Sequence, residues 1–286
     1  MRKFGIDLSK WNGNFDFQRA ISEGVEFVLL RGAYHATKDV KFEDYYSQAK
    51  SKKLPVGVYQ YCMATSEDEA RKEAEFLYQN CLKDKQFELP IYYDMEDNSI
   101  KKLGKVKLTS IAKAWCEYLE AKNFFVGVYA ASSFFDSYLN ESELKSYAHW
   151  VAQWSRDCDK GCGLWQFGGE KNFIRPNKIA GKTTDQDYMF VDYPSMIKEK
   201  GCNGFAKSKE KPFPDLGKGV LKNGSKGEQV KNLQTVLTAL KYDCGKVDGV
   251  YGSKTTAAVK AAQKANKCAV DGVCGNETKA ALKAAF

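Results

Sequence analysis

No apolar run in this sequence reaches the ~18 residues that span a bilayer. The apolar stretch after Arg2 and Lys3 is also too short for the core of a signal peptide. We therefore expect a chain that is synthesised in the cytoplasm, has no leader and crosses a membrane only with help. Histidine is scarce, with only His35 and His149 among 286 residues. Neither has a partner pattern for a metal, so we predict structural roles for both, with no metal and no cofactor.

The nine cysteines are an odd number, so at least one is unpaired. Cys158 and Cys162 are close in sequence, but no second pair and no nearby histidine completes a zinc set. Three cysteines lie in apolar or helical settings that favour buried thiols: Cys62, Cys81 and Cys116. Three others could form a bridge in an oxidising medium, with the pairing left open: Cys244, Cys268 and Cys274.

The length of 286 residues suits a barrel-sized domain followed by an appendage. With 43% hydrophobic, 13% aromatic and 28% charged residues, the composition is that of a soluble globular protein with a sizeable core. The net charge of +8 comes from lysines scattered through helical stretches, and no nucleic-acid-binding motif accompanies them. We expect no nucleic-acid partner, whereas an anionic polymer or surface would attract such a chain.

Short apolar runs, each followed by an amphipathic stretch, recur through the first 200 residues. Two of the amphipathic stretches are clear helices, Ser66–Leu82 with Ser66 as its N-cap, and Thr109–Lys122. Alternation of strands and helices predicts a parallel sheet, and eight repeats predict closure into a (β/α)8-like barrel with its chemistry at the C-terminal strand ends. The eight predicted strands are Phe4–Leu8, Glu26–Arg31, Pro55–Cys62, Pro90–Asp94, Phe124–Ala130, His149–Trp154, Leu164–Phe167 and Tyr188–Asp192.

The fourth of these runs ends in two carboxylates one residue apart, Asp94 and Glu96. Side chains at i and i+2 of a strand share a face, so both acids are predicted to point to one spot. A carboxylic acid beside a carboxylate is the arrangement that cleaves a glycosidic bond. A solvated strand end would have the same sequence pattern, and the rest of the chain must decide between the two.

Four segments stand out in order along residues 1–205: Phe4-Gly5-Ile6-Asp7-Leu8-Ser9 with Trp11-Asn12-Gly13, then Arg31-Gly32-Ala33-Tyr34, Tyr92-Tyr93-Asp94-Met95-Glu96 and Thr184-Asp185-Gln186-Asp187-Tyr188. Their order and spacing resemble those of glycoside hydrolase family 25, the muramidases of phage endolysins and bacterial autolysins. The resemblance implies a flattened (β/α)8-like barrel. It also implies hydrolysis of the β-1,4 bond between N-acetylmuramic acid and N-acetylglucosamine in an acidic groove.

The same resemblance implies the roles of the acids. Glu96 would be the general acid, Asp94 the carboxylate that supports the cationic centre, and Asp7 and Asp185 the flanking acids, with Asp187 a rival to Asp185. Like-charge repulsion and burial should raise the pKa of one acid enough to keep its proton at neutral pH, and we assign that proton to Glu96. A substrate-assisted reaction that retains the anomeric configuration is the preferred route.

Aromatic side chains at strand ends would suit stacking on sugar rings. Packing in the hydrophobic core is the alternative role for each of them, because residues on alternate strand faces are buried. These candidates are Tyr59, Tyr61, Tyr129 and Trp154. Weaker candidates for substrate contact are Arg31, Gln153 and Gln166.

Residues 206–217 are charged and bounded by proline, which is typical of a linker. Beyond them Val247-Asp248-Gly249-Val250-Tyr251-Gly252-Ser253-Lys254-Thr255 recurs as Val270-Asp271-Gly272-Val273-Cys274-Gly275-Asn276-Glu277-Thr278. Each copy predicts a turn, a capping Ser or Asn and a Thr in the first turn of a helix. Helices are expected at Lys226–Leu240, Thr255–Asn266 and Glu277–Ala285. Residues 218–286 thus resemble the peptidoglycan-binding domain type 1, a three-helix module.

Both resemblances point to one polymer, so we predict a cell-wall lytic muramidase anchored to peptidoglycan by its C-terminal domain. A lysin released through a membrane pore would fit the lack of a leader. A chitinase-like hydrolase of N-acetylglucosaminides is an alternative, although Tyr92 occupies the first position of the Asp-x-Asp-x-Glu run of chitinases. A zinc-dependent amidase would need more histidines. A non-catalytic wall-binding protein is the third alternative. Target species and oligomeric state are not determined by the sequence.

Overall fold

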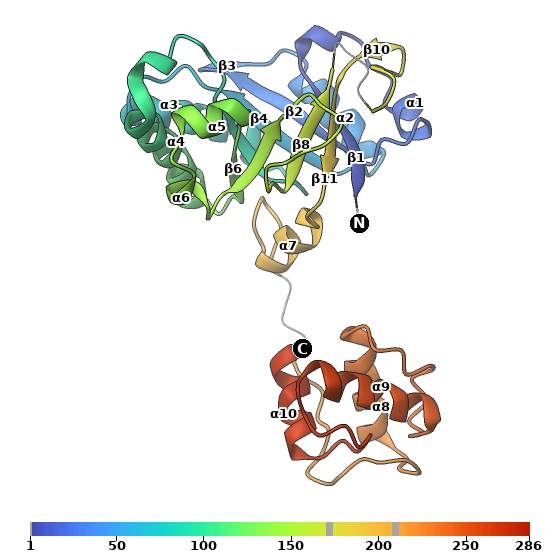
Figure 1. Ribbon diagram of the computed structural model, residues 1–286. Coiled ribbons are helices and arrows are strands. Elements are labelled where there is room, and N and C mark those ends of the chain that lie inside the picture. The colour runs from blue at the N-terminus through green and yellow to red at the C-terminus, as the bar shows by residue number, and fades with distance from the viewer. Residues whose placement is uncertain (1, 170–173, 208–211) are drawn as a thin grey trace. The chain divides into compact units, whose positions relative to one another are not determined.

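The computed structural model of the protein describes residues 2–169, 174–207 and 212–286. The chain divides into two compact units, Met1–Ser208 and Lys209–Phe286. The first is a mixed α/β unit and the second a small helical one (Figure 1). Each has its own hydrophobic core. The predicted linker, 206–217, partly falls on 208–211, outside the described residues. Leu216 of that linker is buried in the core of the second unit, so packing of this unit begins before residue 218.

Eight strands close into a barrel in the first unit, as predicted. The pairing order is β1-β11-β8-β7-β6-β5-β4-β2, and β1 also pairs with β2, which closes the ring. Every pairing in the ring is parallel except those of β11, which runs antiparallel to β1 and β8. The barrel strands are β1 Lys3–Leu8, β2 Phe27–Tyr34, β4 Val56–Tyr61, β5 Ile91–Asp94, β6 Val126–Ala131, β7 Ala148–Ala152, β8 Leu164–Gly168 and β11 Asp185–Met189. Three short strands lie beside the ring: β3 Thr37–Lys38, β9 Lys178–Ile179 and β10 Lys182–Thr183.

The last strand differs from its prediction, since β11 begins at Asp185 and not at Tyr188. The apolar run from Tyr188 to Val191 suggested a strand further along the chain. In the structure Phe190 has left the strand and is exposed. Asp192 caps the next helix, α7 (Tyr193–Lys200), by accepting a hydrogen bond from the backbone N–H of Ser195. Only Tyr188 and Met189 of the predicted strand therefore lie in β11, and its last residue is a helix N-cap.

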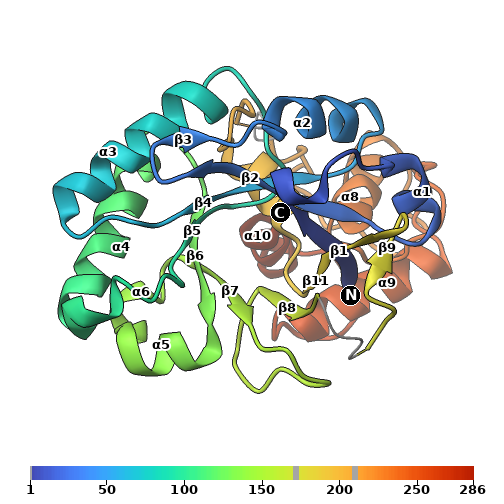
Figure 2. The ribbon, with the colours of Figure 1, turned by 90° about the horizontal axis from the view of Figure 1, so that it is seen from above.

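Helices cover the outside of the barrel, with α2, α3 and α4 outside β2, β4 and β5 (Figure 2). Ser66 caps α3 as predicted, because its Oγ accepts the backbone N–H of Glu69 at 3.2 Å. The predicted alternation of strands and helices does not hold after β7 and β8, where the described residues form a loop and the β9–β10 hairpin. The remaining helices of this unit are η1 Lys10–Asn12, α1 Phe17–Ser22, α2 Phe42–Ser51, α3 Glu67–Leu77, a π-turn η2 Tyr78–Leu82, η3 Lys101–Leu103, α4 Gly104–Glu120, α5 Ser132–Tyr138 and α6 Glu141–Leu144.

Side chains of the strands alternate between the barrel interior and the helical layer. Phe27 and Leu29 of β2 belong to the interior cluster, whereas Val28 and Leu30 pack against the helices. The interior is crowded with aromatic rings. Tyr92 and Trp150 meet there edge to face with their ring centroids 5.3 Å apart. Glycines leave room for these rings.

Replacing Gly127 of β6 with alanine is expected to destabilise the first unit by about 1–3 kcal/mol through overpacking. An added Cβ would overlap the carbonyl oxygen of Ala148 and would lie 2.5 Å from Cε1 of the Tyr92 ring. Moving the backbone or a buried ring aside would cost conformational and packing energy. Calorimetric unfolding of Gly127→Ala should show a lower Tm. Gly161→Ala is the matched control, because nothing lies within 4 Å of its added Cβ, and an equal Tm loss there would contradict the explanation.

The second unit contains the three predicted helices, α8 Glu228–Ala239, α9 Ser253–Ala265 and α10 Asn276–Ala285. Each sequence repeat forms a turn held by a buried glutamine of the preceding helix. Gln234 Nε2 donates to Asp248 Oδ1 at 2.9 Å and to Thr255 Oγ1 at 3.1 Å, while its Oε1 accepts the N–H of Gly249 at 2.8 Å. In the second copy the corresponding residues are Gln263, Asp271, Thr278 and Gly272.

The predicted capping by Ser253 and Asn276 is wrong. Both are the first residues of their helices, and the N-caps are Gly252 and Gly275, without a side-chain cap. The glutamine-bound turn fixes the entry of the chain into each helix, so a capping side chain is not needed. Thr255 and Thr278 lie in the first turns as predicted.

Candidate active site

Three of the four predicted catalytic acids lie on barrel strands and at the same end of the barrel. Asp7 is near the end of β1, Asp94 ends β5, and Asp185 begins β11. Asp7 and Asp185 are direct partners in the β1–β11 register. Because β11 is antiparallel, its start lies beside the ends of the other strands. The sequence placed Asp185 correctly at this end, but by assuming a parallel strand.

The fourth acid, Glu96, follows β5 by two residues and is exposed, whereas Asp94 is only 4% exposed. Asp94 is in register with Tyr61 of β4 and Tyr129 of β6. Its Oδ1 is buried and has no hydrogen-bond partner among the described residues. An unsatisfied buried oxygen at the end of a strand is costly, and a substrate group or a proton would relieve that cost.

The pKa values of both acids are raised. Burial raises the pKa of Asp94 well above its usual value, the charge of Glu96 raises it further, and Arg31 opposes the rise. Burial of the carboxyl among neighbouring atoms also raises the pKa of Glu96, although part of this side chain reaches solvent, and a Tyr129 hydrogen bond opposes the rise. Two interacting acids of this kind titrate as one pair and hold a proton to higher pH than either would alone.

Asp97 supplies a fixed negative charge beside this pair. Hydrogen bonds to Ser99 and Tyr61 lower the pKa of Asp97, with Tyr61 Oη donating to Oδ2 at 3.0 Å. Its charge raises the pKa of both Asp94 and Glu96. No motif in the sequence marks Asp97 as a site residue, since it follows Glu96 directly in an acidic, polar stretch.

A buried hydrogen-bond network connects Asp7 with the aromatic residues. Gln166 of β8 donates Nε2 to Asp7 Oδ2 at 2.9 Å. The Oε1 of Gln166 accepts from Tyr129 Oη at 2.9 Å and from Trp154 Nε1 at 3.1 Å. Gln166 therefore orients residues from three other strands or strand ends. The sequence ranked Gln166 as a weak candidate, because a lone glutamine on a strand carries no motif.

Asp187 lies behind Asp7, on the interior face of β11. It is completely buried, and Trp150 Nε1 donates to its Oδ1 at 2.8 Å. The Oδ2 atom has no donor among the described residues when both carboxyls are ionised, yet Asp7 is close enough to form a hydrogen bond once a proton is present. Burial raises the pKa of Asp187 and of Asp7 well above their usual values. Asp187 is thus a buried neighbour of the site and is less accessible than Asp185.

Asp187→Asn is expected to raise the Tm of the first unit at pH 7 by a few degrees. Each kcal/mol added to the free energy of unfolding corresponds to about 2–4 °C in Tm. The pKa of Asp187 is higher in the folded than in the unfolded chain, so stability falls as the pH rises from about 4 through the folded-state pKa. An asparagine at position 187 has no carboxyl to ionise, so this loss of stability disappears, and its amide group can donate a hydrogen bond to Asp7. Calorimetry should therefore show a gain at pH 7 that shrinks towards pH 4. A gain of equal size at both pH values would contradict the electrostatic cause.

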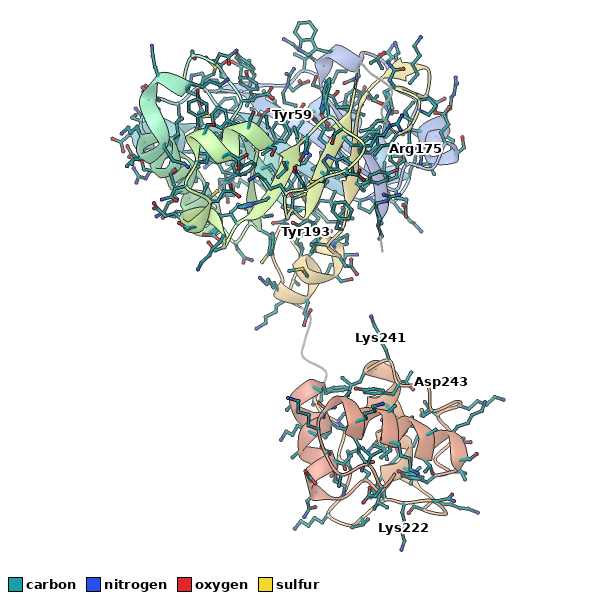
Figure 3. The ribbon with its side chains drawn as sticks, in the orientation of Figure 1. Tyr59, Arg175, Tyr193, Lys222, Lys241 and Asp243 are labelled. Carbon is teal, nitrogen blue, oxygen red and sulfur yellow. The ribbon has the colours of Figure 1, made fainter. Side chains whose placement is uncertain are left out.

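The predicted aromatic residues divide into two groups. Tyr59 and Tyr129 are buried and pack on Trp150, with ring centroids 5.7 and 4.3 Å from it; Figure 3 labels Tyr59 inside the barrel. Tyr61 is partly exposed and stacks on Tyr34 at 4.8 Å. Trp154 is 40% exposed. Only the second group presents ring surface that a sugar could reach.

The other candidate side chains have structural partners. Arg31 forms an ion pair with Asp39 at 2.8 Å. His35 Nδ1 contacts buried Glu73 at 2.6 Å, and His149 Nε2 contacts the carbonyl of Leu144 at 3.2 Å. Cys62, Cys81 and Cys116 are buried free thiols as predicted, and all nine cysteines are unbridged. Within residues 2–169, 174–207 and 212–286, no group of three or more His, Cys, Asp or Glu could hold a metal.

A closed barrel with carboxyls of raised pKa at its C-terminal strand ends defines a glycoside hydrolase. The chain belongs to glycosyl hydrolases family 25, whose model matches residues 6–175. A second model, the putative peptidoglycan binding domain, matches residues 226–282. The protein is therefore a cell-wall lytic muramidase with a peptidoglycan-binding domain. No helix among the described residues has the length and apolar character to cross a membrane.

Known proteins resemble the chain along most of its length. The autolytic lysozyme of Clostridium acetobutylicum is 26% identical over 268 residues, which is 91% of this chain and 72% of that protein. Among solved structures, the CTP1L endolysin is 22% identical and has a TM-score of 0.58, covering 68% of this chain and 69% of that one. A family 25 glycosyl hydrolase from Bacillus anthracis is 20% identical with a TM-score of 0.56, covering 68% and 92%. These structures share the fold of this chain.

Proposed function

We propose that Glu96 is the general acid of a reaction that cleaves the β-1,4 bond between N-acetylmuramic acid and N-acetylglucosamine. The observation that carries this proposal is the pair of raised pKa values at the end of β5. Of the two acids Glu96 is the one that reaches solvent, so it can pass a proton to the glycosidic oxygen of a long polymer. Asp97, held as an anion, keeps that proton available towards neutral pH.

In the first step the proton of Glu96 moves to the leaving oxygen as the C1–O bond breaks. The acetamido oxygen of the substrate attacks C1 and forms a cyclic oxazolinium ion. Asp94 accepts the acetamido N–H with its unpartnered Oδ1 and, as a carboxylate, balances the positive charge. Water then attacks C1 as the bond between C1 and the acetamido oxygen breaks, the Glu96 carboxylate takes the proton of that water, and the restored acetamido group leaves a product of retained β configuration.

The remaining predicted residues support this chemistry. Asp7 and Asp185 flank the pair from the β1–β11 edge, and their negative charge favours a cationic transition state. Tyr61 and Trp154 offer accessible ring faces for sugars. Tyr129 lies beside Glu96, and Tyr59 packs on Trp150 in the barrel interior behind the site.

Mass spectrometry of fragments released from purified walls tests the bond, and nuclear magnetic resonance of fresh products tests the stereochemistry. Reducing ends on muramic acid and a β-anomer formed first are the expected results. Reducing ends on glucosamine would show that the enzyme cleaves the other glycosidic bond of peptidoglycan. An α-anomer formed first would exclude the retaining route. Chitin oligomers serve as a control and should be cleaved poorly.

We also propose the division of labour between the domains: residues 1–205 catalyse, and residues 218–286, packed together with Leu216, hold the enzyme on the wall. The protein would act on the wall from outside the membrane, after release through a pore or another route.

Deleting residues 209–286 is expected to slow the lysis of intact walls by about 10-fold or more, because tethering raises the local substrate concentration. Turnover of soluble glycan fragments should change less than twofold, since the barrel has its own core. Turbidity clearance and reducing-sugar release measure the two rates. Equal losses on both substrates would contradict an anchoring role.

A further inference from the structure

The net charge of the protein is divided unequally between its two units. Residues 209–286 have 14 lysines, no arginine and seven acids, a net charge of +7. Residues 1–208 have 30 basic and 29 acidic residues, so they account for only one unit of the total of +8. The small second unit is therefore strongly basic.

Apart from Lys279, which is partly buried, the lysines of residues 212–286 face solvent. Within residues 212–286 no lysine forms an ion pair, whereas lysines of the first unit bind acids such as Glu67 and Glu88. Figure 3 shows Lys222 and Lys241 projecting outward. The exposed lysines are Lys218, Lys222, Lys226, Lys231, Lys241, Lys246, Lys254, Lys260, Lys264, Lys267 and Lys283.

The acids of residues 212–286 are engaged within their own turns and helices. Glu228 and Glu277 occupy the first turns of α8 and α10, where a negative charge meets the positive end of the helix dipole. Each of the four aspartates accepts the backbone N–H two residues later: Asp215, Asp243, Asp248 and Asp271. The acidic side chains thus shape the backbone, and the positive charge remains available for a partner.

We propose that the second unit also binds the phosphate-bearing anionic polymers that are attached to bacterial walls, in addition to peptidoglycan. Lysines are hydrated point charges on flexible stems, suited to a polyanion of irregular geometry. Nucleic acid fits less well, because the unit has no arginine and its exposed large apolar side chains are aliphatic apart from Phe286, which leaves no stacking platform. The net charge attracts the polymer, and peptidoglycan recognition supplies the specificity.

Binding of the full-length protein to two wall preparations, measured on ice by pelleting, tests the proposal. One preparation keeps its phosphodiester polymers, and the other has lost them through hydrofluoric acid. Binding to the intact walls should be tighter and should weaken steeply between 50 and 500 mM NaCl, since bound polyanions release counterions. Binding to stripped walls should depend little on salt. Equal affinity and equal salt dependence would overturn the proposal.

A variant with Lys222, Lys246, Lys254 and Lys264 changed to glutamine should bind intact walls at least about 10-fold more weakly at 50 mM NaCl. These side chains are exposed, so its circular dichroism and Tm should match the wild type. The matched control changes four exposed lysines of the first unit, Lys53, Lys72, Lys102 and Lys145, and loses the same charge. An equal loss in the control would overturn the assignment to the second unit.

Soluble inorganic polyphosphate identifies the partner chemistry. It should compete for the protein on intact walls and lose that ability in the second-unit variant. Duplex DNA that competes more strongly, at equal phosphate concentration, would overturn the assignment to wall polymers. These measurements concern binding alone, so they do not depend on which acid performs catalysis.

Discussion

Glu96→Gln is expected to lower the turnover of peptidoglycan by about 100- to 10,000-fold, the contribution typical of a positioned general acid. An amide keeps the size of the side chain but has no acidic proton to give. The leaving oxygen would then depart unprotonated. Release of reducing ends from purified walls, followed over hours, measures the residual rate.

The control for this variant is Glu75→Gln, which changes an exposed glutamate of α3, in the helical layer outside the barrel. It should retain wild-type turnover, and both variants should unfold at the wild-type temperature within a few degrees. Wild-type turnover in Glu96→Gln would falsify the central assignment. An equal loss in Glu75→Gln would point to a general effect of the lost charge.

Asp94→Asn is expected to reduce kcat/KM by about 100-fold or more on soluble glycan fragments. The substitution removes the carboxylate that balances the cationic centre, in a buried site where such a charge acts strongly. It also removes a charge that helps the pair hold its proton. Because the two acids titrate as a pair, the higher of their two apparent pKa values should fall, and the basic limb of the pH–rate profile should move to lower pH.

A pH profile of kcat/KM therefore distinguishes this role from a structural one, since a merely structural role would lower the rate without moving the limb. Asp84→Asn is the control, because Asp84 is exposed and asparagine tolerates its positive φ. The Tm of Asp94→Asn at pH 7 should rise, because the folded-state pKa of Asp94 is raised and ionisation there costs stability. A lower Tm together with an unmoved limb would contradict the proposed role.

The local sequence was sufficient for much of the barrel and for the position of the acidic pair, Asp94 and Glu96, at the end of β5. Runs such as Pro90–Asp94 change from apolar to acidic within one residue, which predicts a buried strand with a polar end. The capping of α3 by Ser66 follows from the first turn alone. The repeat around Asp248 and Asp271 predicted two equivalent turns, and the structure contains both.

Contacts between distant segments could not be predicted in the same way. Gln166 joins Asp7, Tyr129 and Trp154, residues up to 159 positions away, and no spacing rule connects them. The hydrogen bond from Tyr61 to Asp97, which adds to the effect of Ser99 in lowering the pKa of Asp97, comes from another strand. Likewise Gln234 and Gln263 lie well before the turns they hold, so the sequence suggested Ser253 and Asn276 as caps instead.

The sequence by itself determined where seven of the eight strands lie, that Asp7 and Asp94 lie at or near strand ends, and which polymer the two domains share, because these depend on patterns of a few residues and on recognisable motifs. Only the tertiary structure decided that β11 runs antiparallel, so that its first residue, Asp185, meets Asp7. Strand direction is fixed by closure of the whole barrel. For the same reason the proton affinities of Asp94, Glu96 and Asp187 emerged only after folding, since burial and neighbouring charge come from every strand at once.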